Sequence, residues 1–285
     1  MHKIVLGILP LDLELELQKP SIRAQVNLPD CRDRTPLHWA TIRGDEYAVK
    51  NLLLAGADAN CQAHGKDTPL HLAAVSQNPR VYKHLITAGA DVNFVNLWGD
   101  KALNCACNHK DIVACVNLLI DSGADLDHRN KLGATPLIDA AKKNNLEIAS
   151  LLLDSQANLH IADVRGETPL FQAIFGGNCE FLALLLQNGD DGMDVTINGS
   201  TVLHHTAQHG DIKTASILAS ARLGRIDPDA KDFKGRTAMQ LLKQRLVMEE
   251  GFEEAFEKLL ESIREADFTD SEGSEVYFSD SENYE

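Results

Sequence analysis

A six-residue motif that returns at a nearly constant interval limits what this chain can fold into more than any other feature of its sequence. It reads TPLHWA from Thr35, TPLHLA from Thr68, KALNCA from Lys101, TPLIDA from Thr135, TPLFQA from Thr168, TVLHHT from Thr201 and TAMQLL from Thr237. The intervals are 33, 33, 34, 33, 33 and 36 residues. Such a period is typical of stacked helical repeats, in which a unit buries its apolar faces only against its neighbours.

Each repeat carries the sequence signals of two helices. Thr-Pro at the start combines a helix cap with a backbone angle suited to the first turn. A polar break such as 43–45 then precedes a second apolar segment, which ends in a motif such as GADAN at 56–60. Its glycine supplies the left-handed residue that closes a helix. The sequence therefore predicts units made of a turn and two antiparallel helices.

Taken together, these motifs resemble the ankyrin repeat. Residues 31–263 hold about seven copies, with TPLHLA and GADVN among the segments closest to the family pattern. The resemblance implies an all-α ankyrin-repeat solenoid of helix-turn-helix repeats with short hairpin-like turns. The amino-acid sequence of residues 35–60 and that of the long closing repeat are similar, more narrowly, to ankyrin segments of large multidomain fungal proteins.

We divide the chain into an N-terminal helical cap at 1–30, a repeat domain of seven repeats at 31–263, and an acidic disordered tail at 264–285. The last repeat is degenerate and is expected to cap the stack. Its helix places five apolar residues on one face: Phe252, Phe256, Leu259, Leu260 and Ile263. We interpret this face as sealing the stack, with a partner-binding helix as the alternative. The tail is a solubilising segment or, alternatively, an interaction or phosphorylation segment.

The charge and cysteine content restrict the partners and the compartment. A formal net charge of −15 repels phosphate backbones, so we expect protein partners and no nucleic acid. Six irregularly spaced cysteines indicate free thiols in a reducing compartment. The sequence shows no secretory signal and no stretch long enough to cross a membrane. We expect a monomeric intracellular protein, in the cytoplasm or the nucleus.

The stretch LNCACNHKD brings Cys105, Cys107 and His109 together and raises the question of a metal or redox site. The repeat register aligns Cys105 with Trp39, and residues two apart on a helix point to nearly opposite sides. The two cysteines are therefore interpreted as structural side chains, with a metal or redox role as the less favoured alternative.

A histidine cluster at 204, 205 and 209 invites a hydrolase interpretation. His204 aligns with His38 and His71, the repeat's own histidine, to which the family resemblance assigns hydrogen bonding in the turn. His205 and His209 could line the groove, but no carboxylate has the spacing of a metalloprotease motif. The chain also lacks phosphate-binding and nucleophile-elbow motifs, so we expect no enzyme activity, no metal and no cofactor.

The family resemblance places partner contacts on the concave face and the turn tips. On the concave face it indicates Ile42, Arg43, Val75, Ser76, Asn108, His109, Lys142, Lys143, Phe175, Gln208 and His209. At the turn tips it indicates Arg32, His64, Trp98, Leu132, Arg165 and Phe233. Trp98 is either an interface anchor or a ring that stiffens the stack by lying on the next turn. Lys142, Lys143 and Arg43 form a basic strip for an acidic ligand or, alternatively, a solvated surface.

The sequence favours a non-catalytic protein–protein interaction module or scaffold. The alternative is the regulatory ankyrin portion of a larger enzyme or signalling protein whose catalytic domain lies elsewhere.

Departures from the repeat pattern predict where the stack is weakest. Lys101-Ala102 replaces Thr-Pro in the third repeat, and Gln156 replaces the helix-closing glycine in the fourth. Left-handed conformation at a non-glycine residue costs about 1 kcal/mol. We expect amide hydrogen exchange to be fastest in the helices of repeats three and four. Uniform protection across all repeats would contradict this expectation.

Overall fold

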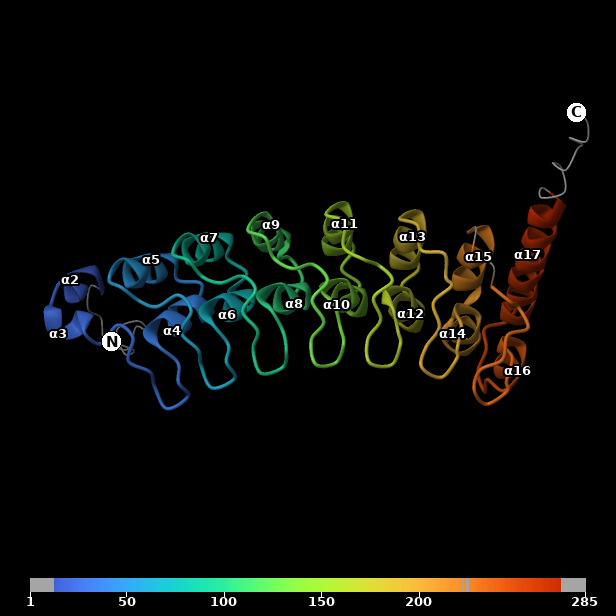
Figure 1. Ribbon diagram of the computed structural model, residues 1–285, viewed down its shortest axis with the longest axis horizontal. Helices are drawn as coiled ribbons and strands as arrows, with labels where there is room; N and C mark the ends of the chain where they lie inside the picture. Colours follow the sequence, from blue (N-terminus) through green and yellow to red (C-terminus); the bar gives the residue numbers. More distant parts are fainter. Residues whose placement is uncertain (1–12, 222, 224–225, 273–285) are drawn as a thin grey trace, which may run out of the picture. The chain divides into compact units, whose positions relative to one another are not determined.

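The structure is a computed structural model that describes residues 13–221, 223 and 226–272 (Figure 1). The chain divides into two compact units, residues 1–164 and 165–285, and each is described by itself.

The first unit consists of a short helical pair followed by four longer helix pairs. The short pair is α2 (Leu13–Leu17) and α3 (Pro20–Arg23). The four pairs are α4 (Pro36–Ile42) with α5 (Glu46–Leu54), α6 (Pro69–Ser76) with α7 (Pro79–Thr87), α8 (Ala102–Cys107) with α9 (Val113–Asp121), and α10 (Pro136–Lys143) with α11 (Leu146–Asp154).

The second unit continues the same alternation. Its helices are α12 (Pro169–Phe175), α13 (Cys179–Gln187), α14 (Val202–His209), α15 (Ile212–Ser220), α16 (Ala238–Lys243) and the long α17 (Phe252–Glu272). The described residues hold no β-strand, and their one isolated bridge joins Lys231 to Thr237. The expected all-α solenoid is confirmed.

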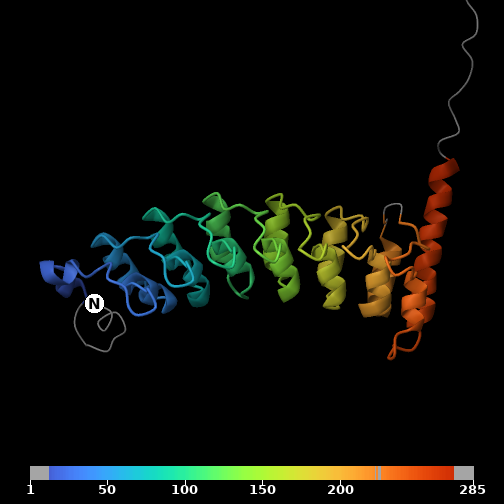
Figure 2. The same ribbon diagram turned by 60° about the horizontal axis from the view of Figure 1, so that its bottom comes forward.

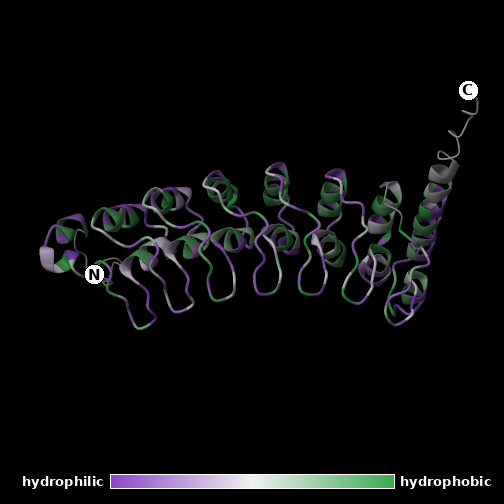
Figure 3. Cartoon of the chain, viewed as in Figure 1, coloured by the Kyte–Doolittle hydropathy of each residue, from purple (hydrophilic) through white to green (hydrophobic). Residues whose placement is uncertain are grey.

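Within each unit the helices form two layers. In the first unit α4, α6, α8 and α10 pack in one row and α5, α7, α9 and α11 in the other, with the long turns extending away from the first row (Figures 1 and 2). Figure 3 shows apolar residues gathered on the helices and polar residues along the connections. The motif leucines Leu37, Leu70, Leu103 and Leu137 are fully buried. The repeated motif thus builds a continuous core.

In the three repeats that have it, the motif histidine ties the repeat to the next one. In the second repeat the Thr68 N–H donates to Nδ1 of His71 at 3.2 Å, and His71 Nε2 lies 3.0 Å from the carbonyl oxygen of Asp100 in the following repeat. A carbonyl oxygen only accepts, so the ring is neutral and protonated at Nε2. His38 and His204 make the same contacts, which confirms the role that the family resemblance assigned to this histidine.

An asparagine ladder joins the other ends of the repeats in the first unit. Asn60 accepts from the Asp91 N–H at 2.7 Å and donates to the Gly89 carbonyl at 2.9 Å. Asn27 and Asn93 make the equivalent pairs of bonds to their own following repeats. Asp127 occupies the next rung and only accepts, from the Asn158 N–H at 2.8 Å. That rung therefore has one hydrogen bond in place of two.

Non-glycine residues keep the left-handed turn conformation where the sequence replaces glycine. The backbone angle φ is 58° at Asp33, 58° at Lys66 and 70° at Gln156. The repeats therefore keep their turn geometry at these positions, at some cost in backbone strain.

Both ends of the described chain are helical and cover a repeat. At the start α2 packs against α5, and Asn27 joins the ladder. At the end α17 packs against α15 and buries all five apolar residues that the sequence placed on one face. The helix runs to Glu272, past the expected start of the tail at 264. The expectations for residues 1–12 and 273–285 fall outside the described residues.

The histidine contact predicts a specific loss of stability. His71→Leu should lower the free energy of unfolding by about 2–4 kcal/mol, because the Thr68 N–H and the Asp100 carbonyl lose their buried partner. His71→Asn should cost less, because Asn104 at the equivalent position already accepts from the Lys101 N–H at 3.2 Å. Urea unfolding of both variants measures the difference. Equal destabilisation would show that ring packing, and not the hydrogen bonds, holds this position.

Candidate protein-binding site

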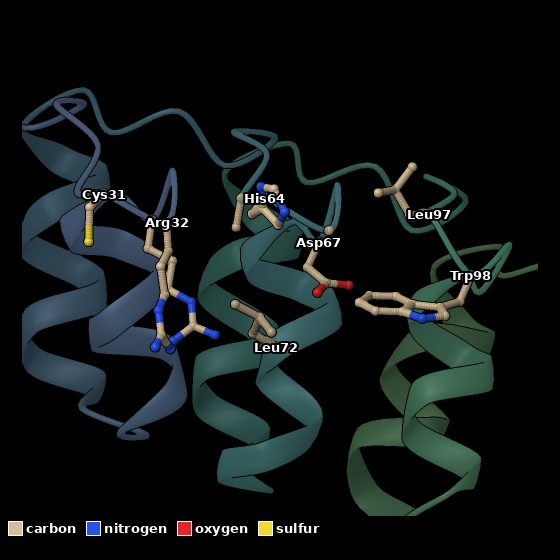
Figure 4. A pocket seen from close by; sticks show the side chains of 10 residues that line it. Cys31, Arg32, His64, Asp67, Leu72, Leu97 and Trp98 are labelled. Carbon is tan, nitrogen blue, oxygen red and sulfur yellow. The ribbon is translucent and has the colours of Figure 1, made fainter.

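A groove opens between the turn tips and the inner helices of the first unit (Figure 4). Its volume is about 590 Å³. We call it the tip groove, and its lining residues are Cys31, Arg32, Arg34, Ala63, His64, Gly65, Asp67, Leu72, Leu97 and Trp98. Three consecutive repeats contribute to it, so the groove exists only when the repeats are stacked.

The turn that carries Trp98 is fixed by hydrogen bonds. The Asn96 side chain accepts from the backbone N–H groups of Trp98 and Asp100, each at 2.9 Å. It also donates to Oδ1 of Asp67 at 2.9 Å, which ties the turn to the preceding repeat. The Leu97 N–H donates to the Gly65 carbonyl at 2.9 Å. Trp98 is therefore presented by a rigid turn.

Trp98 takes the stacking position that one interpretation of its sequence position predicted, and it stays partly exposed. Its ring lies against the turn of the preceding repeat, where a Cβ atom added to Gly65 would come within 2.8 Å of the ring. Glycine at this position therefore allows the close approach. The side chain nevertheless remains 58% exposed. The ring stiffens the stack on one face and is available to a partner on the other.

The lining of the tip groove contains two arginine side chains in addition to its apolar residues. The Arg34 guanidinium lies over the Trp39 ring at 4.9 Å, and Arg32 is exposed with no side-chain partner among the described residues. The Asp67 carboxylate is the acid in the lining, and it accepts from Asn96. The groove therefore presents Leu72 and Trp98 together with the cationic side chain of Arg32, and Figure 4 labels all three residues.

The concave-face residues of the first unit spread over four repeats without meeting at one point. Arg43, Val75, Asn108, Lys142 and Lys143 are exposed, whereas Ile42, Ser76 and His109 are half-buried. Ser76 donates to the Ala73 carbonyl at 3.0 Å and Asn108 to the Asn104 carbonyl at 3.1 Å. None of these eight residues lines the tip groove.

The second unit brings three of the expected residues together. Phe175, Gln208 and His209 are exposed and line one cavity of about 550 Å³. The Phe175 and His209 rings meet edge to face with centroids 4.9 Å apart. His205 lines the same cavity, as its sequence position suggested.

Apart from His205, sequence reasoning missed a row of residues four positions after the first residue of each motif. The row consists of Trp39, Leu72, Cys105, Asp139, Gln172 and His205. Leu72 lines the tip groove, and His205 lines the cavity of the second unit. The signal was present, because this is the one motif position that differs in each of the first six repeats.

Within this row, burial of the Asp139 carboxyl costs the folded protein free energy. Its side chain is buried, and the nearest donor in the described contacts, Nδ2 of Asn104, lies 3.5 Å from its Oδ2. Burial raises the pKa of the Asp139 carboxyl to about 6. A carboxyl with so little hydrogen bonding destabilises the folded unit when it is charged.

The cysteines of LNCACNHKD occupy the helix as the register predicted. Cys107 is fully buried and Cys105 is half-buried. Burial raises the pKa of both thiols above the ordinary value. They are therefore protonated at neutral pH, and a protonated thiol is a poor nucleophile and a poor metal ligand.

Within the described part of the chain, no helix combines the length and the apolar character needed to cross a membrane.

Fold and groove together define a helical-repeat protein. A family model described as ankyrin repeats in three copies matches residues 14–96, 37–130 and 103–197. The chain therefore belongs to the ankyrin repeat family. No curated protein is similar enough to the chain to count as a relative.

Solved structures of similar proteins are also ankyrin repeat domains. The chain is 28% identical to the ankyrin repeat domain of Bcl-3, described as a unique member of the IkappaB protein family, with a TM-score of 0.67 over 81% of this chain and 98% of that one. It is 25% identical to the ankyrin repeat domain of human ASB11, with a TM-score of 0.67 over 79% of this chain and 98% of that one. Neither match supports the narrower resemblance to fungal multidomain proteins.

Because the Asp139 carboxyl is buried, replacing it should increase the stability of the first unit, and the increase should depend on pH. In the unfolded chain an aspartic acid loses its proton near pH 3.9, whereas folded Asp139 holds its proton to about pH 6. Stability from this group is therefore lost as the pH rises between these two values. Asp139→Asn should stabilise the first unit by about 3 kcal/mol at pH 7.5 and by much less at pH 4. Thermal unfolding at both pH values measures the gain.

Glu147→Gln removes an exposed carboxylate from the same unit and serves as the matched control. The control should leave the melting temperature unchanged at both pH values. A gain at pH 7.5 that both variants share would reflect net charge and would contradict the role of burial.

Proposed function

We propose that this protein is a non-catalytic recognition module that binds partner proteins through its turn tips and its concave face, with the tip groove as the principal site. The contact surface includes the concave-face residues named above and is centred on Trp98. The module acts as a monomer inside the cell, and its net charge of −15 directs it to proteins and away from nucleic acid.

The observation that carries this proposal is the state of Trp98. A tryptophan that is 58% exposed, yet held by a rigid turn and backed by Gly65, gives up little conformational freedom when a partner covers it. Tryptophan in such a setting is the side chain most enriched among residues that dominate binding energy. A ring that served packing alone would be covered by its neighbours.

The chemistry of the tip groove selects a partner segment. Leu72 and Trp98 provide apolar surface for an aliphatic or aromatic side chain. Arg32 favours a carboxylate next to that side chain, because a guanidinium group binds a carboxylate with two parallel hydrogen bonds. The segment we propose therefore has an apolar residue flanked by Asp or Glu.

Similarity to other ankyrin repeat proteins supports a binding role over a catalytic one. Ankyrin repeats mediate protein–protein interactions, and the fold presents side chains on a preformed surface. The similarity does not extend to a partner, because the same fold carries many different sites.

Two exposed turn-tip side chains provide a matched pair for testing the proposal. Trp98 lines the tip groove, whereas Leu132, at the equivalent tip of the next repeat, is 66% exposed and does not line it. Trp98→Ala should remove a partner protein that affinity purification from the native cell recovers with the wild type, and Leu132→Ala should retain it. Calorimetry with the purified partner should show at least tenfold weaker binding to Trp98→Ala, since anchors of this kind contribute about 2 kcal/mol or more.

Two further variants locate the contact more closely. Gly65→Ala displaces the Trp98 ring without removing it and should weaken the same partner. Replacing Arg43, Lys142 and Lys143 together by alanine tests the concave basic strip. Partners that bind all of these variants as well as the wild type would rule out both the tip groove and the strip.

A further inference from the structure

The connection between α16 and α17, the last two helices of the second unit, is longer than the connection inside any earlier repeat pair (Figure 1). It spans the eight residues 244–251, whereas the pairs from α4 and α5 to α14 and α15 are joined by two to five residues. We call residues 244–251 the long loop. Because two to five residues are enough to join two stacked helices, stacking does not require the additional residues of the long loop.

The tip of the long loop is apolar and exposed to solvent. Leu246 is 100% exposed, Val247 is 80% exposed and Met248 is 37% exposed. No hydrogen bond among the described residues uses the backbone N–H of any of these three residues. Scattered single apolar side chains are normal on a protein surface, whereas contiguous exposed apolar residues mark interaction sites.

The base of the long loop is held in place by Arg245. Its Nη1 atom donates to the Gly210 carbonyl at 2.7 Å, at the end of α14, and its guanidinium lies over the Phe252 ring at 5.2 Å. Phe252 is buried at the start of α17, and its N–H donates to the Glu249 carbonyl at 3.1 Å. The residues on both sides of the tip are therefore fixed to the helices of the unit. Such anchoring reduces the conformational freedom that the tip loses when a partner covers it.

Negative charge follows the apolar tip directly. Glu249 and Glu250 are exposed, and two more glutamates follow at 253 and 254 in the first turn of α17. None of these four carboxylates forms an ion pair within the described part of the chain. Residues 243–254 hold only two cations against them, and one of the two is Arg245 at the base. The surface beside the tip therefore favours a partner that carries positive charge.

We propose that the long loop is a docking site, which inserts Leu246 and Val247 into an apolar pocket of a partner protein whose rim carries Lys or Arg. The rim pairs with Glu249 and Glu250. A protein fits this site better than a lipid surface does, because anionic membranes repel the glutamates and the net charge of −15. The site is separate from the tip groove and the concave-face residues. At the long loop this chain supplies the inserted side chains, and the partner supplies the pocket.

Exposed positions allow variants that separate the apolar tip from its charge. Leu246→Gln with Val247→Gln, the tip variant, removes the apolar surface. Glu249→Gln with Glu250→Gln, the charge variant, removes the carboxylates beside it. Leu54→Gln is the matched control, because Leu54 is 71% exposed on α5 of the first unit. All three variants should unfold at the temperature of the wild type, since exposed side chains contribute little to stability.

The test uses the purified full chain with the photo-cross-linking residue p-benzoylphenylalanine at position 247. After irradiation in an extract of the native cell, this chain should be joined covalently to a protein. A second preparation with the same cross-linking residue at position 54 should not be joined to that protein. Mass spectrometry identifies the captured protein and the segment of it that was joined. The protein is then purified, and calorimetry measures its affinity for the wild type and the variants.

The tip variant should bind the purified protein at least tenfold more weakly than the wild type does, which corresponds to about 1.4 kcal/mol. The charge variant should also bind more weakly. Added salt should weaken the binding of the wild type more than that of the charge variant, because salt screens exposed charges. Leu54→Gln and Trp98→Ala should bind the protein as the wild type does.

The proposal is wrong if position 247 captures no protein that position 54 does not, or if either double variant binds as tightly as the wild type. Capture of a second copy of this chain would make the long loop a self-association contact. Binding to phosphatidylserine vesicles that the tip variant loses would make it a membrane contact. Either result would overturn the proposal. A loss of binding in Trp98→Ala would assign the captured protein to the tip groove, which would also overturn it and leave the proposed function standing.

Discussion

The contact between a motif histidine and the carbonyl of the following repeat is the interaction on which the grooves depend. It uses both ring nitrogens, one to close the start of its own helix and one to fix the turn of the next repeat. The turn tips are therefore set at a fixed spacing by chemistry that lies in the core. Burial lowers the pKa of His38 and His71, which keeps the neutral ring that this geometry needs.

Each of the two cavities takes one lining residue from the motif position that varies between repeats. The motif leucine is buried in each repeat of the first unit, but the residue two positions later changes from repeat to repeat, and at Leu72 and His205 it lines a cavity. The tip groove and the cavity of the second unit share some repeat positions, such as those of Leu72 and His205, and carry different side chains there. One presents arginines beside Trp98, and the other presents paired charges around a histidine. The fold thus fixes where a partner can bind, and the individual repeats decide what kind of partner it is.

Sequence periodicity was sufficient to predict the architecture, since the same residues recur at the same interval and each has one structural role. The family resemblance predicted the histidine contact, and the apolar spacing at 252–263 predicted the burial of the α17 face. The sites were harder to predict, because a groove depends on which turn tips lie against each other. The position of Trp98 on Gly65 and the contact between the Phe175 and His209 rings are three-dimensional relations between repeats, and no single repeat encodes them.

The asparagine ladder gives the first unit an uneven mechanical strength. Its first three rungs each hold two hydrogen bonds, whereas the rung at Asp127 holds one, because a carboxylate cannot donate. Under a pulling force along the row of repeats, this rung offers less resistance than the three rungs that hold two hydrogen bonds each. The exchange of one amide for one carboxylate therefore weakens one link of the ladder under tension, without changing its resting fold.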